Sequence, residues 1–141
     1  MAETLAGGRP AFTECLPRRA ESAKTARGLV DRALHLWGLE ALTDSAQLVV
    51  TELVANAVNH GRRETIRVSA SRLDQAVVQV SVADLSRKVP ALSLRPVADL
   101  AESGRGLLLV NALCPRWGVE PLRWGKRVWA DLDADAEGCG A

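Results

Sequence analysis

The sequence lacks an excess of either charge and lacks any long apolar run. Its 18 basic residues nearly balance its 17 acidic residues, so the formal net charge is +1. Such a balance gives no electrostatic reason to expect nucleic acid or a membrane as a partner. No apolar run approaches the length of a membrane span, and the N-terminus carries no apolar core of the signal-peptide kind.

Cysteine is also scarce. Cys15, Cys114 and Cys139 are odd in number and widely spaced. They predict neither a disulfide framework nor a metal-binding cluster, and they are typical of a protein in the reducing cytoplasm. No internal repeat is visible. The 141 residues, with 48% hydrophobic and 25% charged side chains, are therefore expected to form one globular domain in the cytoplasm.

The first half of the chain is expected to form a strand followed by two helices. A short strand is predicted over residues 11–16. Apolar residues then recur at helical spacing over residues 18–39. A second helix is expected to be capped by Thr43 or Asp44 and to continue to His60.

The second half is expected to form two hairpins around a third helix. Residues 65–73 and 78–84 alternate between apolar and polar side chains, as in a hairpin with one buried face. A helix is predicted from about residue 106 to Cys114, where Pro115 stops it.

Two strands, at residues 116–120 and 127–132, are expected to close the fold. Trp117 and Trp129 are interpreted as core residues. Lys126 is interpreted as a solvated turn residue, with a phosphate contact as the alternative.

The domain is expected to occupy residues 11–132. Residues 1–10 are expected to be a flexible N-terminus, and residues 133–141 a flexible tail. Residues 91–103 follow no clean period and are long for a connection, which favours a lid or another functional loop.

The second helix carries polar residues in an apolar setting. Glu52 and Asn56 are four residues apart and stack on one helix face, with Asn59 nearly on the same line and Gly61 as the helix stop. An unpaired buried polar group costs about 1–3 kcal/mol, so these groups need partners. Two interpretations remain open: an internal hydrogen-bond network, or a ligand site in which oxygen atoms hold a hard cation or a carboxylate acts as a general base.

A carboxylate extends the buried face of the fourth predicted strand. Val78, Val80 and Val82 point the same way, and Asp84 continues their alternation at the strand end. A carboxylate on the helix side of a sheet is costly unless a donor meets it. The alternation favours a ligand-binding role for Asp84 over an exposed turn. No glycine occurs in the segment from Asp84 to Pro90.

Two glycines flank an arginine just before the third predicted helix. Gly104 and Gly106 would let backbone N–H groups approach an anion, and the helix N-terminus adds positive potential. Arg105 supplies a charge-assisted donor for phosphate oxygens. A lone Gly-x-Gly is weak evidence, and the alternative is an ordinary junction between loop and helix.

These three motifs resemble, in matching order, those of the GHKL ATPases, which include histidine kinases, gyrase, Hsp90 chaperones and anti-sigma factor serine/threonine kinases. Glu52–Gly61 reads Glu-x-x-x-Asn-Ala-x-x-His-Gly and resembles the N-box. Gly104–Val110 resembles the G2 box. The segment after Asp84 departs from the usual Asp-x-Gly-x-Gly of the G1 box, and this degenerate form is similar to that of short actinobacterial anti-sigma-type proteins.

The resemblance implies an α+β two-layer sandwich, the Bergerat fold, with a mixed, mostly antiparallel sheet and helices on one face. It also implies ATP and Mg²⁺ as ligands. Asn56 would ligate Mg²⁺, Asp84 would accept a hydrogen bond from the adenine amine, and Glu52 would orient or deprotonate the attacking hydroxyl or water. The nucleotide-binding residues implied in addition are Gly104, Arg105, Gly106 and Leu107.

Within this superfamily, the length favours a stand-alone anti-sigma factor-like kinase, because a histidine-bearing dimerisation domain or a transducer domain would need more residues. Such kinases bind a sigma factor, phosphorylate a small antagonist protein on serine or threonine, and often form homodimers. The alternative is a nucleotide-gated binding module that holds a partner without transferring phosphate. A purely structural domain is disfavoured by the intact Glu52, Asn56 and Gly-Arg-Gly.

Overall fold

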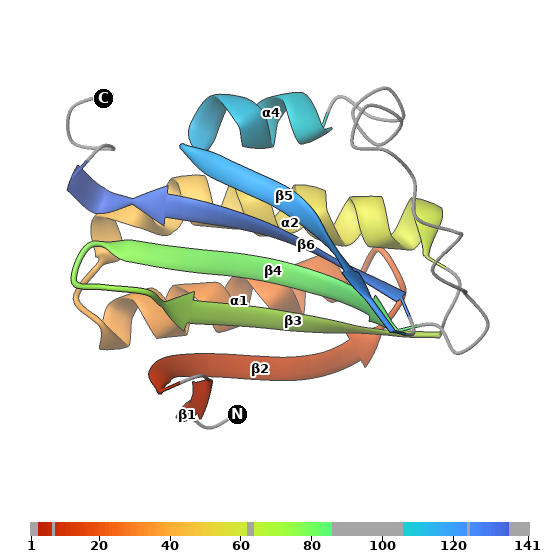
Figure 1. Ribbon diagram of the computed structural model, residues 1–141, viewed down its shortest axis with the longest axis horizontal. Helices are drawn as coiled ribbons and strands as arrows, with labels where there is room; N and C mark the ends of the chain where they lie inside the picture. Colours follow the sequence, from red (N-terminus) through yellow and green to blue (C-terminus); the bar gives the residue numbers. More distant parts are fainter. Residues whose placement is uncertain (1–2, 7, 62–63, 86–105, 124, 136–141) are drawn as a thin grey trace.

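The computed structural model describes residues 3–6, 8–61, 64–85, 106–123 and 125–135 (Figure 1). Its elements, in chain order, are strands β1 (Glu3–Ala6) and β2 (Arg9–Pro17), helix α1 (Ser22–Leu36), the 3-10 helix η1 (Glu40–Leu42), helix α2 (Thr43–His60), strands β3 (Thr65–Arg72) and β4 (Val77–Leu85), helix α4 (Gly106–Leu113), and strands β5 (Arg116–Leu122) and β6 (Gly125–Asp133).

The strands form one six-stranded sheet in the order β1-β2-β3-β4-β6-β5. Every pairing in it is antiparallel, whereas the sequence predicted a mixed, mostly antiparallel sheet. The connections explain the difference. Two helices, not one, lie between β2 and β3, so the chain returns in the opposite direction. Strands β4 and β5 run the same way, but β6 lies between them.

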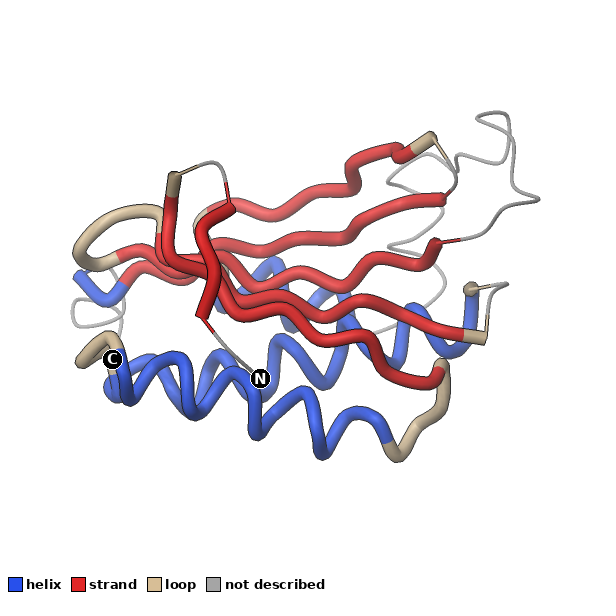
Figure 2. The backbone as a smooth tube through the Cα atoms, turned by 90° about the horizontal axis from the view of Figure 1, so that it is seen from below, coloured by secondary structure: helices blue, strands red, loops and turns tan. Residues whose placement is uncertain are grey.

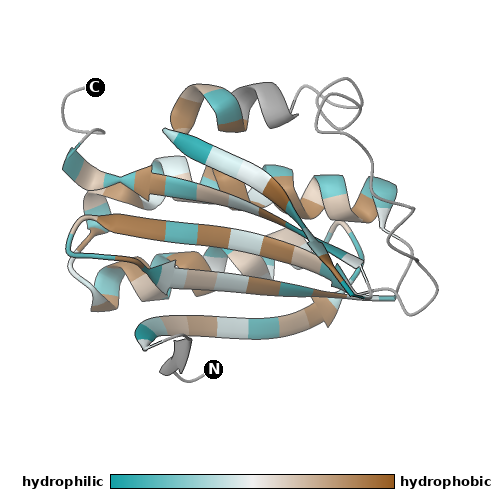
Figure 3. Ribbon diagram, viewed as in Figure 1, coloured by the Kyte–Doolittle hydropathy of each residue, from teal (hydrophilic) through white to brown (hydrophobic). Residues whose placement is uncertain are grey.

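The helices cover one face of this sheet, which gives the predicted α+β two-layer sandwich (Figures 1 and 2). Helices α1 and α2 pack against each other, and α2 also contacts β4, β6 and α4. Figure 3 shows apolar and polar residues alternating along the strands. The alternation predicted for Val78, Val80 and Val82 is confirmed, since all three are buried. In the described part of the chain, no helix combines the length and the apolar character that a membrane span requires.

The helix boundaries differ from the predicted ones in ways that backbone contacts explain. Helix α1 begins at Ser22, not at residue 18. Gly38 adopts a φ of 70° just after it, the left-handed conformation that glycine adopts at helix ends. Neither Thr43 nor Asp44 caps α2 with its side chain, because η1 runs directly into the helix and the N–H of Thr43 bonds to the carbonyl of Glu40.

The chain ends also contain more ordered structure than the sequence predicted. Strand β1 lies within the segment expected to be flexible, and it pairs with the start of β2. At the other end, β6 extends to Asp133, and the N–H of Ala134 bonds to the carbonyl of Ala76 at 2.8 Å. Backbone pairing with β2 and β4, and the bond to the turn before β4, thus include residues that composition alone marked as tails.

The outer face of the sheet carries a polar network that the sequence did not reveal. Gln79 donates to the carboxylate of Asp131 at 2.9 Å, and Arg116 pairs with the same carboxylate at 3.2 Å. The core prediction holds for Trp117, which packs against the core. It is wrong for Trp129, which lies on the outer face opposite Gly118 because its neighbours on either side point inward.

The different burial of two leucines of α1 predicts that their replacement by alanine changes stability by very different amounts. Leu34 is 0% exposed, whereas Leu36 is 63% exposed. Leu34→Ala should lower the free energy of unfolding by about 2–5 kcal/mol, because it leaves a cavity in packed surroundings. The control Leu36→Ala should change it by less than about 0.5 kcal/mol. Urea denaturation measures both, and similar losses in the two variants would contradict this packing.

Candidate functional site

The C-terminal half of α2 carries the predicted polar residues on its flank. Asn56 is only 9% exposed, Glu52 is half-buried and Asn59 is exposed. The side-chain oxygen Oδ1 of Asn56 is buried and has no hydrogen-bond partner among the residues that the structure describes. The helix is thus polar along the line that the spacing predicted, and burial increases from Asn59 to Asn56.

The unpartnered oxygen of Asn56 bears on the choice between the two interpretations of this helix. A buried acceptor without a donor costs about 1–3 kcal/mol, and native structures contain few of them. An internal hydrogen-bond network would satisfy this oxygen, and the described residues provide none. A cation or a donor supplied by a ligand would satisfy it, which favours the ligand-site interpretation.

Asp84 lies where the alternation predicted, at the end of β4 on the helix-covered face. Its side chain is 6% exposed. In the sheet it stands opposite Ile66 of β3 and Lys126 of β6. Directly opposed residues share a face, so Lys126 also lies on the side of the helices and is half-buried. The interpretation of Lys126 as a solvated turn residue is therefore wrong, because β6 begins one residue earlier.

Gly61 follows the last residue of α2 and packs closely against Asp84. A Cβ atom added to Gly61 would lie 2.4 Å from the carbonyl oxygen of Ala57 and 3.0 Å from Oδ2 of Asp84. Its φ of −74° and ψ of 163° are open to any residue, so the predicted helix stop does not depend on the left-handed conformation of glycine. Glycine is needed here because there is no room for a side chain. Asn56 lies five residues before it, about 7.5 Å along the helix.

Arg18 lies against the same glycine, and the sequence gave no sign of this. Its Cδ atom would be 2.6 Å from a Cβ atom on Gly61, and its Nη1 donates to the carbonyl of Val58 at 2.7 Å. The sequence prediction placed Arg18 at the start of the first helix and gave it no role. No spacing in the sequence marks it, because its contacts come from a segment 40 residues further along the chain.

The predicted glycine motif is described only in part. Gly106 and Leu107 form the first turn of α4, while Gly104, Arg105 and the predicted lid at 91–103 lie outside the described residues. Figure 1 shows that the start of α4, the end of α2 and the end of β4 all point toward the same end of the molecule. Helix α2 contacts both α4 and β4. The described parts of the three motifs thus lie toward one end of the molecule, although they are far apart in the sequence.

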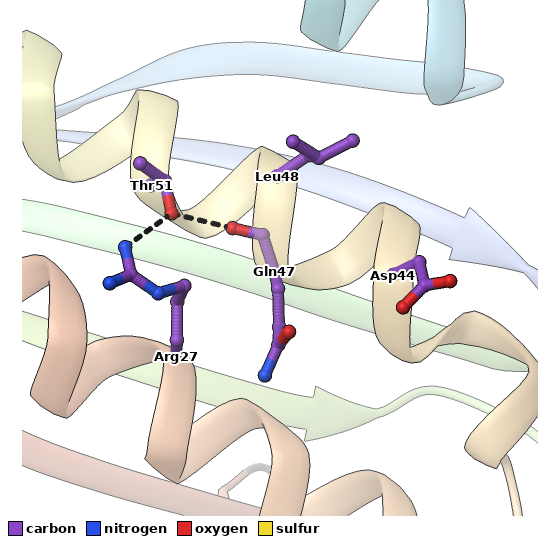
Figure 4. A pocket seen from close by; sticks show the side chains of 5 residues that line it. All are labelled: Arg27, Asp44, Gln47, Leu48 and Thr51. Carbon is purple, nitrogen blue, oxygen red and sulfur yellow. Dashed lines mark hydrogen bonds between the residues drawn. The ribbon is translucent and has the colours of Figure 1, made fainter.

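A hollow of about 480 Å³ lies elsewhere, on the outward face of α2 (Figure 4). Arg27 of α1 reaches across it and donates to Thr51 at 3.1 Å. Leu48 of α2 lines this hollow and is 49% exposed. None of the predicted site residues lines it. This hollow is therefore not the predicted site.

The close packing at Gly61 predicts that Gly61→Ala and Gly28→Ala change the free energy of unfolding in opposite directions. Gly61→Ala should lower the free energy of unfolding by about 1–3 kcal/mol, because the new methyl group meets a backbone carbonyl that cannot move aside. The control Gly28→Ala, inside α1 with nothing within 4 Å of the added atom, should raise it by about 0.5–1 kcal/mol. Urea denaturation of both variants is the measurement. Stabilisation by Gly61→Ala would show that the end of α2 is not packed in this way.

Comparisons with known proteins identify the family and the fold. A 74-residue stretch is 38% identical to an uncharacterised protein of Streptomyces coelicolor, covering 50% of this chain and 69% of that protein. The fold is similar to a histidine kinase domain from an Erythrobacter litoralis blue-light activated histidine kinase, with a TM-score of 0.50 and 15% identity, over 88% of this chain and 64% of that one. The model of the histidine kinase-like ATPase domain matches residues 16–129. This chain therefore belongs to the histidine kinase-like ATPase domain family.

Proposed function

We propose that this protein binds ATP with Mg²⁺ and acts as an anti-sigma-factor-like regulator, a kinase that phosphorylates a small antagonist protein on serine or threonine. The observation that carries the proposal is the buried Oδ1 atom of Asn56, which lacks a partner among the described residues on the helix that resembles the N-box. Membership of the histidine kinase-like ATPase family supports ATP as the ligand.

The residues present fit a magnesium nucleotide. An amide oxygen is a suitable ligand for a hard cation, and Mg²⁺ in nucleotide sites takes few protein ligands because phosphates and water supply the rest. Asn56 would hold the ion through Oδ1. The start of α4 would present backbone N–H groups and the positive end of its dipole to the phosphates. When bound, Mg²⁺ would neutralise charge on the transferred phosphoryl group.

Asp84 would select the base. Its carboxylate is an acceptor, and it is buried at the end of β4 beside the last turn of α2. An acceptor in that position would receive a hydrogen bond from the exocyclic amine of adenine. A base with a carbonyl oxygen at the same place would set two acceptors against each other in a desolvated site, which is costly.

Glu52 would act on the nucleophile. It stands one helical turn before Asn56 on the same flank of α2, and its half-burial leaves it within reach of a bound partner. Phosphoryl transfer relies on positioning and charge stabilisation, with one residue that orients the attacking group. Glu52 would accept the proton of the antagonist hydroxyl or hold it in line.

The partners we propose are a sigma factor, a small antagonist protein and a second copy of this chain. Support comes from the degenerate motif after Asp84, which is similar to that of the actinobacterial anti-sigma-type proteins. The second candidate function is a nucleotide-gated binding module without phosphoryl transfer. It is favoured by the absence of glycine between Asp84 and Pro90, because residues with side chains limit how closely a backbone can approach a nucleotide.

Asn56→Ala should abolish the enhancement of ATP binding by Mg²⁺, because the ion loses an oxygen ligand. The measurement is calorimetric titration with ATP, with and without Mg²⁺. Asn59→Ala is the matched control, since it removes an exposed amide from the next turn of the same helix. If Mg²⁺ strengthens binding as much in Asn56→Ala as in the parent, Asn56 is not a magnesium ligand.

Glu52→Gln should leave ATP affinity nearly unchanged but slow phosphoryl transfer by roughly a hundredfold or more, because the amide cannot accept the proton. The measurement is transfer of radiolabel from ATP to candidate antagonist proteins. Asp44→Asn, an exposed carboxylate on the same helix, is the control and should transfer like the parent. Equal transfer by Glu52→Gln and the parent would remove Glu52 from catalysis. Tight ATP binding without transfer by the parent to a partner that it binds would favour the binding module.

A further inference from the structure

Arg18 ties together three segments that meet at the end of α2. It lies in the bend between β2 and α1. Its backbone N–H donates to the carbonyl of Glu64 at 2.7 Å, just before β3. Its side-chain Nη1 donates to the carbonyl of Val58 at 2.7 Å, in the last turn of α2. One half-buried residue thus joins the exit of β2, the end of α2 and the entry to β3.

The bond to Val58 satisfies a group that the helix itself leaves unpaired. The last four carbonyls of a helix have no intrahelical donor, and α2 ends at His60. A guanidinium at this end also meets the negative end of the helix dipole. Because Arg18 comes from another part of the chain, it fixes where the helix ends relative to the sheet.

The stem of Arg18 also sets the position of Gly61 relative to Asp84. A Cβ atom added to Gly61 would lie 2.6 Å from Cδ of Arg18 and 3.0 Å from Oδ2 of Asp84. The arginine stem, the glycine and the carboxylate are therefore packed together. Removing the stem would open space beside Gly61, and the last turn of α2 could then move relative to the carboxylate.

We infer that Arg18 is a positioning residue for base recognition: it holds the end of α2 against the end of β4 so that the carboxylate of Asp84 faces the exocyclic amine of adenine. The inference rests on the proposed nucleotide binding and extends it to a residue outside the three motifs. Arg18 need not touch the nucleotide. It acts through Gly61, and its loss should weaken discrimination between bases more than it weakens phosphate binding.

The test compares ATP with inosine triphosphate, whose base has a carbonyl oxygen in place of the exocyclic amine. Calorimetry gives the affinity ratio of the two nucleotides, and thermal denaturation gives the melting temperature. The parent should prefer ATP. Arg18→Met should reduce the preference about three- to tenfold, as expected for one misplaced hydrogen bond. The preference of Arg18→Lys should lie between those of the parent and Arg18→Met, because lysine keeps an aliphatic stem and a positive charge but lacks the planar guanidinium group.

Two further variants calibrate the result. Asp84→Asn should reduce the preference for ATP directly, and the loss in Arg18→Met is compared with the loss in this variant. Arg19→Met is the matched control. Arg19 is an exposed neighbour that donates from its backbone N–H to the carbonyl of Pro17 and accepts at its own carbonyl from the N–H of Ser22, and the variant should behave like the parent. Where Arg18→Met does not fold, the nucleotide ratio of Arg18→Lys decides.

The outcomes separate this inference from the proposed function. A parent that prefers ATP, with an Arg18→Met variant that melts earlier but keeps the full preference, would overturn the positioning role and leave Arg18 as a helix cap. A parent that binds neither nucleotide would overturn the proposed function, and the inference with it. A reduced preference in Arg18→Met and Arg18→Lys, but not in Arg19→Met, supports the inference.

Discussion

The close packing of the end of α2 on the sheet is the constraint on which the candidate site depends. Helix α2 contacts α1, α4, β4 and β6, so its direction is set on several sides at once. At its last turn, Gly61 leaves no room for a side chain beside Asp84. The contact brings the end of the helix that carries Asn56 next to the strand end that carries Asp84. Rigid elements hold such groups more precisely than loops do.

Burial gives the polar residues of the site their chemical character. Asn56 and Asp84 are each almost fully buried, at the edge of the apolar core. A polar group in such a place is costly unless it is paired, and an electrostatic interaction there is stronger than in water. The unpartnered Oδ1 of Asn56 is therefore both a loss of stability for the described part of the chain and an available ligand atom. Functional sites commonly retain such groups at the expense of stability.

Arg18 and Lys126 show how tertiary contacts add positive charge around that site. Neither residue lies in a motif, yet one contacts Gly61 and the other stands opposite Asp84 in the sheet. The outer face of the sheet has a different character, with a network of arginine, glutamine and aspartate side chains across β4, β6 and β5. The two faces of β4 and β6 thus differ: the inner face carries the core and the candidate site, and the outer face carries a polar network.

The sequence by itself determined the elements whose residues repeat with a clear period. Helix α2, the hairpin of β3 and β4, the closing hairpin and the inward direction of Asp84 all follow from local alternation, which depends only on backbone geometry. The motif order also determined the family. Only the tertiary structure decided that β2 pairs antiparallel with β3 and β4 with β6, that Glu3–Ala6 joins the sheet, and that Arg18 contacts the end of α2. Those features depend on which distant segments meet, and residue spacing along the chain carries no information about contacts between segments that lie far apart in the sequence.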